Sequence, residues 1–528
     1  MMAEEIVDVL VIGSGPGGVA VTKRLADLGA QVLCLEQGDW INRSDYPSIK
    51  PDWETFGRRG TFSSQHIVRE NYPVVMAKGN QRGITGLSAV GGTAALHDGQ
   101  HHVRFRPSDF RVRTLTGVAD DWPIRYEDLV PYYEMHDIEI GMSGLAGDPA
   151  NPPRKPRPNP PLAIGPIAKR MGSAFDKLGW YWWVCENAVP SRPHNGRPGC
   201  MQHGMCRLGC FHQVKPTPDV SYWPKALQKG ARLKTWSRVR EVTVDSQGRA
   251  NGALYYDRDG NLHEQPARVV VVSCSGVGTP RLLLNSKSKL YPQGLANSTG
   301  VVGKFFMGHV WGSFDAIVEE RMDGTNTIPL PSTCQHFYES DLSRGFAQGY
   351  VFLVHNTSGP LGYAIGDAVW GAEHHRSMLK HFPHHIGMST LGDDLPEETN
   401  YVELDPDVKD PNGIPAPRVF YKYGENSLKM QAHAKRMGLM AMEATGGTEI
   451  SYEDRFPSGS HLMGTARMGN DPKRSVVNAW NQAHDVKNLV IVDASSFTTG
   501  APVNPTATIF ALGLRAADGI WNRRREWS

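Results

Sequence analysis

The sequence predicts a mixed α/β fold, with a parallel βαβ unit at the front of the chain and antiparallel strands further on. The first observation is an apolar strand at residues 7–12, a glycine-rich turn, a helical pattern to about residue 28 and a second strand at 31–35. The second is ARVVVVSCSGVGTPRLLLNS, residues 267–286, which repeats the order of strand, glycine turn and helix. The third is the alternation of polar and apolar residues from Tyr401 to Asp405, followed by a DPNG turn and a returning strand at 418–423.

The glycine turn at the front has the spacing that a bound dinucleotide requires. It consists of Gly13, Ser14, Gly15, Pro16, Gly17 and Gly18. Gly13 permits the tight turn, Gly15 lets the backbone approach a pyrophosphate, and Gly18 lets helix pack on strand. The helix N-terminus offers N–H groups and the positive end of its dipole to phosphates. Glu36, at the end of the second strand, is placed to accept hydrogen bonds from a ribose. A plain glycine-rich turn in a parallel sheet is the alternative, and the motif alone does not separate FAD from NAD.

Composition narrows the class of protein. The 528 residues include 40% hydrophobic and 21% charged residues, which is typical of a globular protein with a large core. Lys plus Arg (56) nearly balances Asp plus Glu (54), so we expect no nucleic-acid partner. No apolar run approaches the roughly 20 residues of a transmembrane helix, so we expect no membrane insertion. The first residues lack the features of a secretory signal, which predicts a cytoplasmic protein.

Two further stretches complete a recognisable set of motifs. Residues 488–521 have a strand ending at Asp493, a loop and a helix from about Pro505, and SGSHLMGTARMG precedes them at 458–469. GSGPGG, GVGTPRLLL, HLMGTARMG and VDAS…NPTATI occur in this order along the chain. As a set they resemble the glucose–methanol–choline (GMC) family of FAD oxidoreductases.

The resemblance implies an FAD-binding Rossmann-like fold with a discontinuous substrate domain built on an antiparallel β-sheet. The FAD-binding domain is expected at residues 1–50, 80–105, 225–310 and 455–528. The substrate domain is expected at 51–79, 106–224 and 311–454, with a cysteine segment at 199–215.

The same resemblance assigns further residues to the cofactor. GITGLSAVGGTAALHDG, residues 83–99, is similar to the loop that lies along the flavin in this family. Some relatives attach the flavin to a histidine in this loop, but His97 is one place away from that position, so we expect non-covalent FAD. Outside the glycine turn and Glu36, the residues expected to contact FAD are Gly91, Gly92, Thr93, Val239, Asp493, Ala494, Pro505 and Thr506.

The resemblance also implies the chemistry. Oxidising an alcohol removes a proton from oxygen and a hydride from carbon, and the flavin accepts the hydride at N5. The histidine that opens the HLMGTARMG stretch, His461, matches the family's base, and a histidine suits this task because its pKa lies near working pH. Asn504 matches the partner position, where an amide can donate to the substrate oxygen. Pro505 then begins a helix whose N-terminus stabilises negative charge on the reduced ring.

Three of the seven cysteines, Cys200, Cys206 and Cys210, are crowded into PGCMQHGMCRLGC. This spacing resembles a subgroup of bacterial glucose, gluconate and related sugar dehydrogenases, in which three cysteines hold a 3Fe–4S cluster. The alternatives are a zinc site completed by His203 or His212, and plain thiols. In that subgroup the catalytic chain is exported with a small signal-bearing partner subunit and passes electrons to a cytochrome, so a periplasmic location is the alternative to a cytoplasmic one.

The predicted function is therefore an FAD-dependent dehydrogenase that oxidises a CH–OH group of a sugar, glycoside or similar polyol. Electrons would leave through the cluster to an external acceptor. A GMC oxidase that makes hydrogen peroxide and an aryl or aliphatic alcohol dehydrogenase are the enzymatic alternatives. A flavin-binding protein without turnover is the alternative from another class, and the His461/Asn504 pair argues against it.

Overall fold

The computed structural model describes residues 5–51, 72–77, 86–96, 102–357, 359–366, 369–455 and 461–527. His97, on which the prediction of non-covalent flavin depends, lies outside these residues.

The first of three sheets contains the predicted βαβ unit. Its order is β5-β2-β1-β8-β7-β6, and β16 also pairs with β8. The strands are β1 Val7–Ile12, β2 Val32–Leu35, β5 Arg232–Lys234, β6 Arg238–Val244, β7 Ala250–Tyr256, β8 Leu262–Val272 and β16 Leu489–Ile491. β8 has two kinds of neighbour: residues 262–266 pair antiparallel with β7, and residues 267–272 pair parallel with β1 and β16. The front, middle and back of the chain thus meet in one sheet.

Helices pack closely on this sheet. α1 (Pro16–Asp27) lies against α11 (Thr506–Asn522) and α6 (Pro218–Gln228), and α11 lies against α4 (Tyr126–Ile140). Glycines permit the α1–α11 contact, because a Cβ at Gly513 would lie 2.9 Å from the carbonyl oxygen of Gly17. The predicted helix after β8 is α7, Ser275–Asn285.

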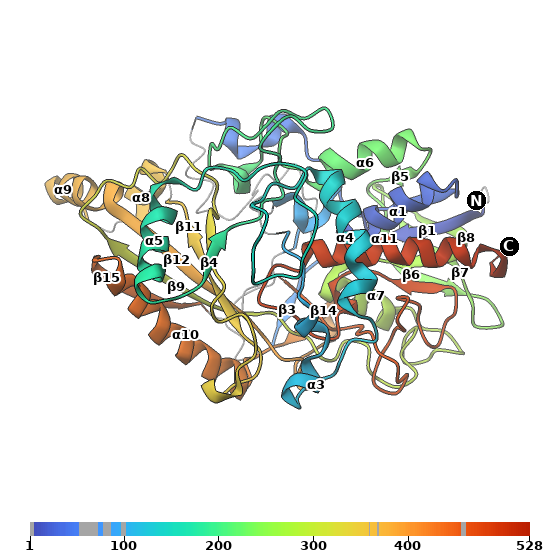
Figure 1. Cartoon of the computed structure of the whole chain (residues 1–528). Helices are drawn as coiled ribbons and strands as arrows, with labels where there is room; N and C mark the ends of the chain where they lie inside the picture. The colour runs from blue at the N-terminus through green and yellow to red at the C-terminus, as the bar shows by residue number, and fades with distance from the viewer. Residues whose placement is uncertain are drawn as a thin grey trace.

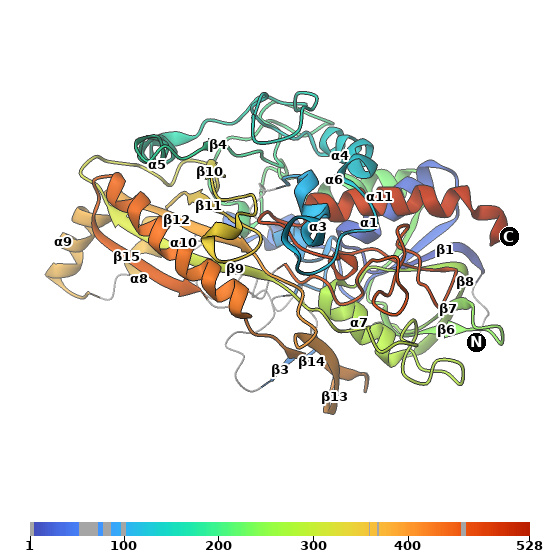
Figure 2. The ribbon, with the colours of Figure 1, turned by 60° about the horizontal axis from the view of Figure 1, so that its bottom comes forward.

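The second sheet is the predicted antiparallel one. It has six strands in the order β15-β9-β12-β11-β10-β4, and each pair is antiparallel. The strands are β4 Trp182–Val184, β9 His309–Ile317, β10 Ser332–Cys334, β11 Tyr350–His355, β12 His385–Asp393 and β15 Thr448–Arg455. Figures 1 and 2 show this sheet beside the first body, with α5 (Gly165–Lys177) and α10 (Glu425–Ala444) next to it.

The two faces of the second sheet bury different side chains. Val310, Phe314 and Phe352 pack with residues of α5 and α10. Val351 and Leu391, on the opposite face, belong to the core of the first body, and Trp311 packs against that core. The strand register places Trp311, Leu391 and Val351 side by side. One face of the second sheet therefore packs against the part of the chain that holds the first sheet.

One predicted hairpin forms a separate sheet. β13 (Tyr401–Lys409) and β14 (Pro415–Phe420) pair around the DPNG turn as predicted, but β14 continues to β3 (Val75–Met76), in the three-stranded sheet that Figure 2 shows below the other two. The hairpin therefore forms as predicted, in a sheet other than the six-stranded one. On α10, Met430 is buried but Met440 is 42% exposed, because α10 covers the second sheet with only one side.

The remaining elements are short. They are α3 Val112–Thr116, α8 Pro360–Gly366, α9 Ala372–His381 and the 3₁₀ turns η1 Arg43–Asp45, η2 Pro47–Ile49, η3 Gly92–Leu96, η4 Pro107–Phe110, η5 Cys206–Leu208, η6 Leu342–Arg344, η7 Phe382–His384, η8 Ala494–Ser496 and η9 Arg524–Glu526. In the described part of the chain, no helix combines the length and apolarity needed to cross a bilayer. The predicted domain boundaries stay predictions.

Candidate active site

The glycine turn is shaped by close backbone contacts on one side and is open on the other. Gly13 has φ +98°, and a Cβ there would lie 2.2 Å from the carbonyl oxygen of Ser273. A Cβ at Gly17 would lie 1.9 Å from the carbonyl oxygen of Val492, and one at Gly18 equally close to that of Gly13. A Cβ at Gly15, the N-cap of α1, would meet nothing within 4 Å. The space in front of Gly15 is where the motif predicts a pyrophosphate.

Glu36 connects the end of β2 to this turn. Its carboxylate accepts hydrogen bonds from the Ser14 amide (3.0 Å), the Ser14 hydroxyl (2.6 Å) and the Gly38 amide (2.9 Å). Burial raises the pKa of the carboxyl, although these donors counter the effect. The Ser14 hydroxyl in turn accepts from the Gly91 amide at 3.2 Å. Glu36 thus braces the turn and the segment carrying Gly91, while its predicted ribose contact stays a prediction.

The other residues predicted to bind the cofactor lie around this turn. A Cβ at Gly92 would lie 3.3 Å from the Cα of Gly15, and Thr93 is exposed in η3. Val239 lies in β6, two residues after Ser237, whose amide donates to the carbonyl oxygen of Glu36 at 2.8 Å. Pro505 caps α11 and Thr506 is its first residue.

Asp493 connects the nucleotide-binding sheet to the loop that carries the predicted base. It accepts from the Ser275 amide (3.0 Å), the Thr279 hydroxyl (2.6 Å) and the Ser495 amide (2.7 Å). The next carbonyl, that of Ala494, accepts from the Gly464 amide at 3.0 Å. These bonds position residues 461–469 over the end of β16.

The structure brings the predicted catalytic residues together and adds a third. His461 Nε2 and Asn504 Nδ2 are 3.4 Å apart. His461 Nδ1 lies 2.9 Å from Nδ1 of His309, whose Nε2 lies 2.7 Å from the carbonyl oxygen of Ala501. His461 has a left-handed backbone with φ +59°. Nothing in the sequence around His309 marks it, because its contact with His461 spans 152 residues; the strand alternation shows only that it shares a face with Trp311.

Two polar atoms beside His461 point to a ligand. Within the described residues, Asn504 Oδ1 and Trp311 Nε1 are buried without a hydrogen-bond partner. The Trp311 ring centre lies 5.9 Å from that of His461. Because buried polar atoms normally have partners, these two are candidate contacts for a bound molecule.

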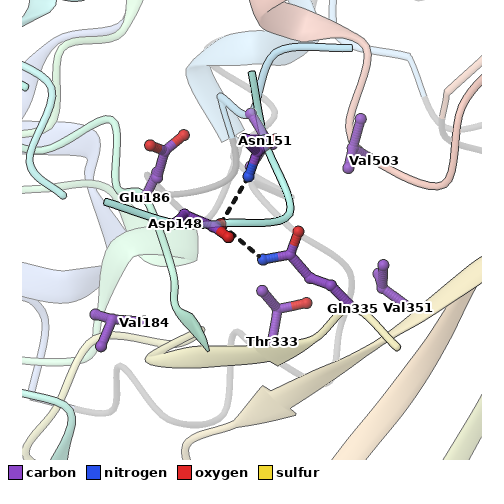
Figure 3. A pocket seen from close by; sticks show the side chains of 9 residues that line it. Asp148, Asn151, Val184, Glu186, Thr333, Gln335, Val351 and Val503 are labelled. Carbon is purple, nitrogen blue, oxygen red and sulfur yellow. Dashed lines mark hydrogen bonds between the residues drawn. The ribbon is translucent and has the colours of Figure 1, made fainter. Parts of the chain in front are cut away.

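The structure has a pocket that Val503, the residue before Asn504, lines together with side chains of β4, β10 and β11 (Figure 3). Its polar wall is built around Asp148, whose carboxylate accepts from Asn151 Nδ2 (2.6 Å) and Gln335 Nε2 (3.2 Å). The Thr333 hydroxyl is buried with no partner among the described residues. Besides these four residues, the pocket is lined by Val103, Val184, Glu186, Val351 and Val503.

The cysteine segment lies against η3. Lys215 Nζ donates to the carbonyl oxygens of Ala95 (3.0 Å) and Cys206 (2.8 Å). Cys200 and Cys210 pack against one small apolar cluster, and burial raises the pKa of the Cys200 thiol. Among the residues that the structure describes, no group of three or more His, Cys, Asp or Glu side chains could hold a metal ion. In this structure the three thiols are therefore not arranged for a cluster or for zinc.

The site combines a glycine turn at a helix N-terminus with a histidine–asparagine pair that contacts His309 of the antiparallel sheet. This combination is typical of a nucleotide-dependent oxidoreductase of the α/β class. Residues 164–310 and 396–513 match the two parts of the family described as GMC oxidoreductase. The chain belongs to the GMC oxidoreductase family, as its motifs predicted, and membership supports FAD as its cofactor.

The similar proteins match this chain over nearly its whole length. A 2-methyl-1,2-propanediol dehydrogenase of Mycolicibacterium austroafricanum is 41% identical, over 98% of this chain and 95% of that protein. The large subunit of a fructose dehydrogenase of Gluconobacter japonicus is 29% identical, over 98% of both. A formate oxidase of Aspergillus oryzae RIB40, studied for modification of its FAD, has the same fold with a TM-score of 0.67, 15% identity and complete coverage of both chains.

Replacing Gly15 by Val should remove FAD without unfolding the protein. The added Cβ would meet no protein atom within 4 Å, but the side chain would occupy the space predicted for the pyrophosphate. We expect a purified Gly15→Val protein with wild-type circular dichroism and no flavin absorbance. Gly18→Val should instead fail to fold, because its Cβ would meet backbone at 1.9 Å. Wild-type flavin content in Gly15→Val would contradict the cofactor position.

Proposed function

We propose that this protein is an FAD-dependent dehydrogenase that oxidises a CH–OH group of a polyhydroxylated substrate such as a sugar or polyol. The observation that carries the proposal is the His461–Asn504 pair, on a segment that is hydrogen-bonded to the residues following β16. The open space at Gly15 fits a pyrophosphate, and the unpartnered atoms of Asn504 and Trp311 fit a molecule bound beside His461. FAD, when bound, supplies the acceptor for the hydride.

The protein's own residues have two tasks in this reaction. His461 accepts the proton of the substrate hydroxyl as that O–H bond breaks. The Asn504 side chain orients the hydroxyl, since an amide offers both donors and an acceptor and does not compete for the proton. Trp311, half-buried beside His461, covers the apolar side of the substrate carbon.

The pocket that Val503 lines supports a substrate with additional hydroxyl groups. Asp148, Asn151, Gln335 and Thr333 provide both donors and acceptors, which matches hydroxyl groups that need both. Four valines provide apolar surface for C–H groups. Glu186 behind this wall stays ionised, because Arg157 and Arg154 outweigh the effect of burial and lower its pKa to about 2. The similar dehydrogenases are named for a diol and for a sugar, which agrees with this wall.

Replacing His461 by Ala should retain the flavin and slow its reduction. General-base assistance contributes about 10²–10⁴-fold to such rates, and we expect a loss of this size in stopped-flow reduction by the substrate without oxygen. His433→Ala is the matched control, since His433 is a half-buried histidine that contacts Tyr350. Near-normal reduction in His461→Ala would exclude the proposed base.

Replacing Thr333 by Val should weaken binding of polyols. The change conserves shape and removes a buried hydroxyl that faces the pocket, and a lost hydrogen bond corresponds to about a 2–10-fold rise in KM. A monohydric alcohol should show no rise. Thr390→Val is the control, because its hydroxyl is also buried without a partner among the described residues but lies on the face toward α10. Equal effects of both variants would contradict a subsite at this pocket.

The finer proposal is that Cys200, Cys206 and Cys210 bind a 3Fe–4S cluster for electron exit. Their spacing supports it, as does the position of the segment against η3, the expected flavin loop. The arrangement of the thiols in this structure does not fit a metal site, so no step of the reaction is derived through a cluster.

Iron analysis of anaerobically purified protein tests this proposal. A cluster predicts about three irons per chain, and Cys206→Ser should lose them while retaining the fold. Cys334→Ser, a buried cysteine in β10, should keep the iron. One zinc per chain would indicate the zinc site instead. An active enzyme without metal would show that the three cysteines are plain thiols, and would reject the cluster.

A further inference from the structure

Four groups form a continuous row from the backbone to the substrate side. The carbonyl oxygen of Ala501 lies 2.7 Å from His309 Nε2, His309 Nδ1 lies 2.9 Å from His461 Nδ1, and His461 Nε2 faces Asn504 Nδ2 at 3.4 Å. Each histidine thus uses both ring nitrogens toward a defined neighbour. This row of contacts determines which ring nitrogen of each histidine carries a hydrogen.

The carbonyl end fixes the hydrogen on His309. A carbonyl oxygen only accepts, so His309 Nε2 must carry a hydrogen. His309 is fully buried, and burial lowers its pKa to about 4, so the ring is neutral at working pH. Asp393 is its partner across the β9–β12 ladder, and burial raises the pKa of this carboxyl well above its ordinary value. A neutral imidazole has one N–H, so His309 Nδ1 is an acceptor.

This acceptor determines the tautomer of His461. Two ring nitrogens 2.9 Å apart need one hydrogen between them, and here it must belong to His461 Nδ1. In the neutral ring, Nε2 then has the lone pair and faces Asn504, whose amide N–H is a donor. Without His309, either nitrogen of His461 could carry the hydrogen.

We propose that His309 is a positioning residue that holds His461 in the Nδ1–H tautomer, so that Nε2 accepts the substrate proton. This proposal rests on the proposed role of His461 as base. In the step, the substrate O–H bond breaks, an N–H bond forms at Nε2, and the electron pair stays on the substrate oxygen. His461 then carries both hydrogens and continues to donate through Nδ1. The row ends at a carbonyl, which cannot take up a proton, so the proton stays on His461 until release on the substrate side.

The first test compares two substitutions in the FAD-loaded enzyme. His309→Leu removes the acceptor, and we expect the limiting rate of flavin reduction to fall about 10–100-fold, with little change in KM, as part of the general-base contribution is lost. His309→Asn places an amide oxygen near the former Nδ1, and we expect it to recover most of the rate. His385→Leu, which removes another histidine of the same sheet bonded to Asp315, is the matched control and should keep the rate.

The second test needs no His309 variant. ¹⁵N NMR of histidine-labelled wild type, compared with His461→Ala to assign the signals, should show Nδ1 of His461 protonated and Nε2 unprotonated in the neutral form. A purely structural role of His309 would not fix this tautomer. The opposite tautomer, or equal rates in His309→Leu and wild type, would overturn the proposal.

The proposed base, His461, and the proposed role of His309 can be rejected independently of each other. Fast flavin reduction in His461→Ala would reject the base itself. Slow reduction in His461→Ala together with normal reduction in His309→Leu would reject only the role of His309.

Discussion

Backbone contact between the glycine turn and the C-terminal strand is the constraint on which the site depends. The carbonyl oxygen of Val492 occupies the position that a Cβ at Gly17 would need. Asp493 and Ala494 follow directly, and they hold the starts of α7 and of the segment at Gly464. A side chain at Gly17 would therefore displace the segment that leads to Asp493 and Ala494, and with it the loop that carries His461. Nucleotide binding and catalysis are thus positioned by one set of close approaches.

The two bodies contribute different parts of the site. The nucleotide-binding body provides His461 and Asn504 on loops that follow its strands, where parallel sheets commonly bind ligands. The antiparallel sheet provides His309 and Trp311 from a strand buried on both faces. His309 is hydrogen-bonded to Ala501 and to His461, so it fastens the sheet to the catalytic loops. A rigid strand holds a side chain more accurately than a loop does, which suits a residue that must orient another.

Short sequence motifs predicted the features that depend mainly on residues close together in the sequence. The glycine turn, the strand before it and the pairing of His461 with Asn504 followed from motifs, and the hairpin at 401–423 followed from alternation and its turn. The sequence did not show which sheet receives the hairpin, because pairing partners depend on segments far away in sequence. His309 was missed for the same reason. The bonds of Glu36 to Ser14 could not be foreseen either, since the motif describes the ligand and not the apoprotein.

Burial favours the neutral forms of the titratable groups behind His461, and this has a chemical consequence. It lowers the pKa of His309 to about 4, raises the pKa of Asp393, and raises the pKa of Asp109 to about 7. A fixed carboxylate at this place would hold the acquired proton on His461 strongly and slow its release. A neutral acceptor such as His309 stabilises the protonated ring through one hydrogen bond without a full opposite charge. In the proposed reaction, this arrangement allows His461 to gain a proton during oxidation and to lose it again in each turnover, as a base that works in every cycle must.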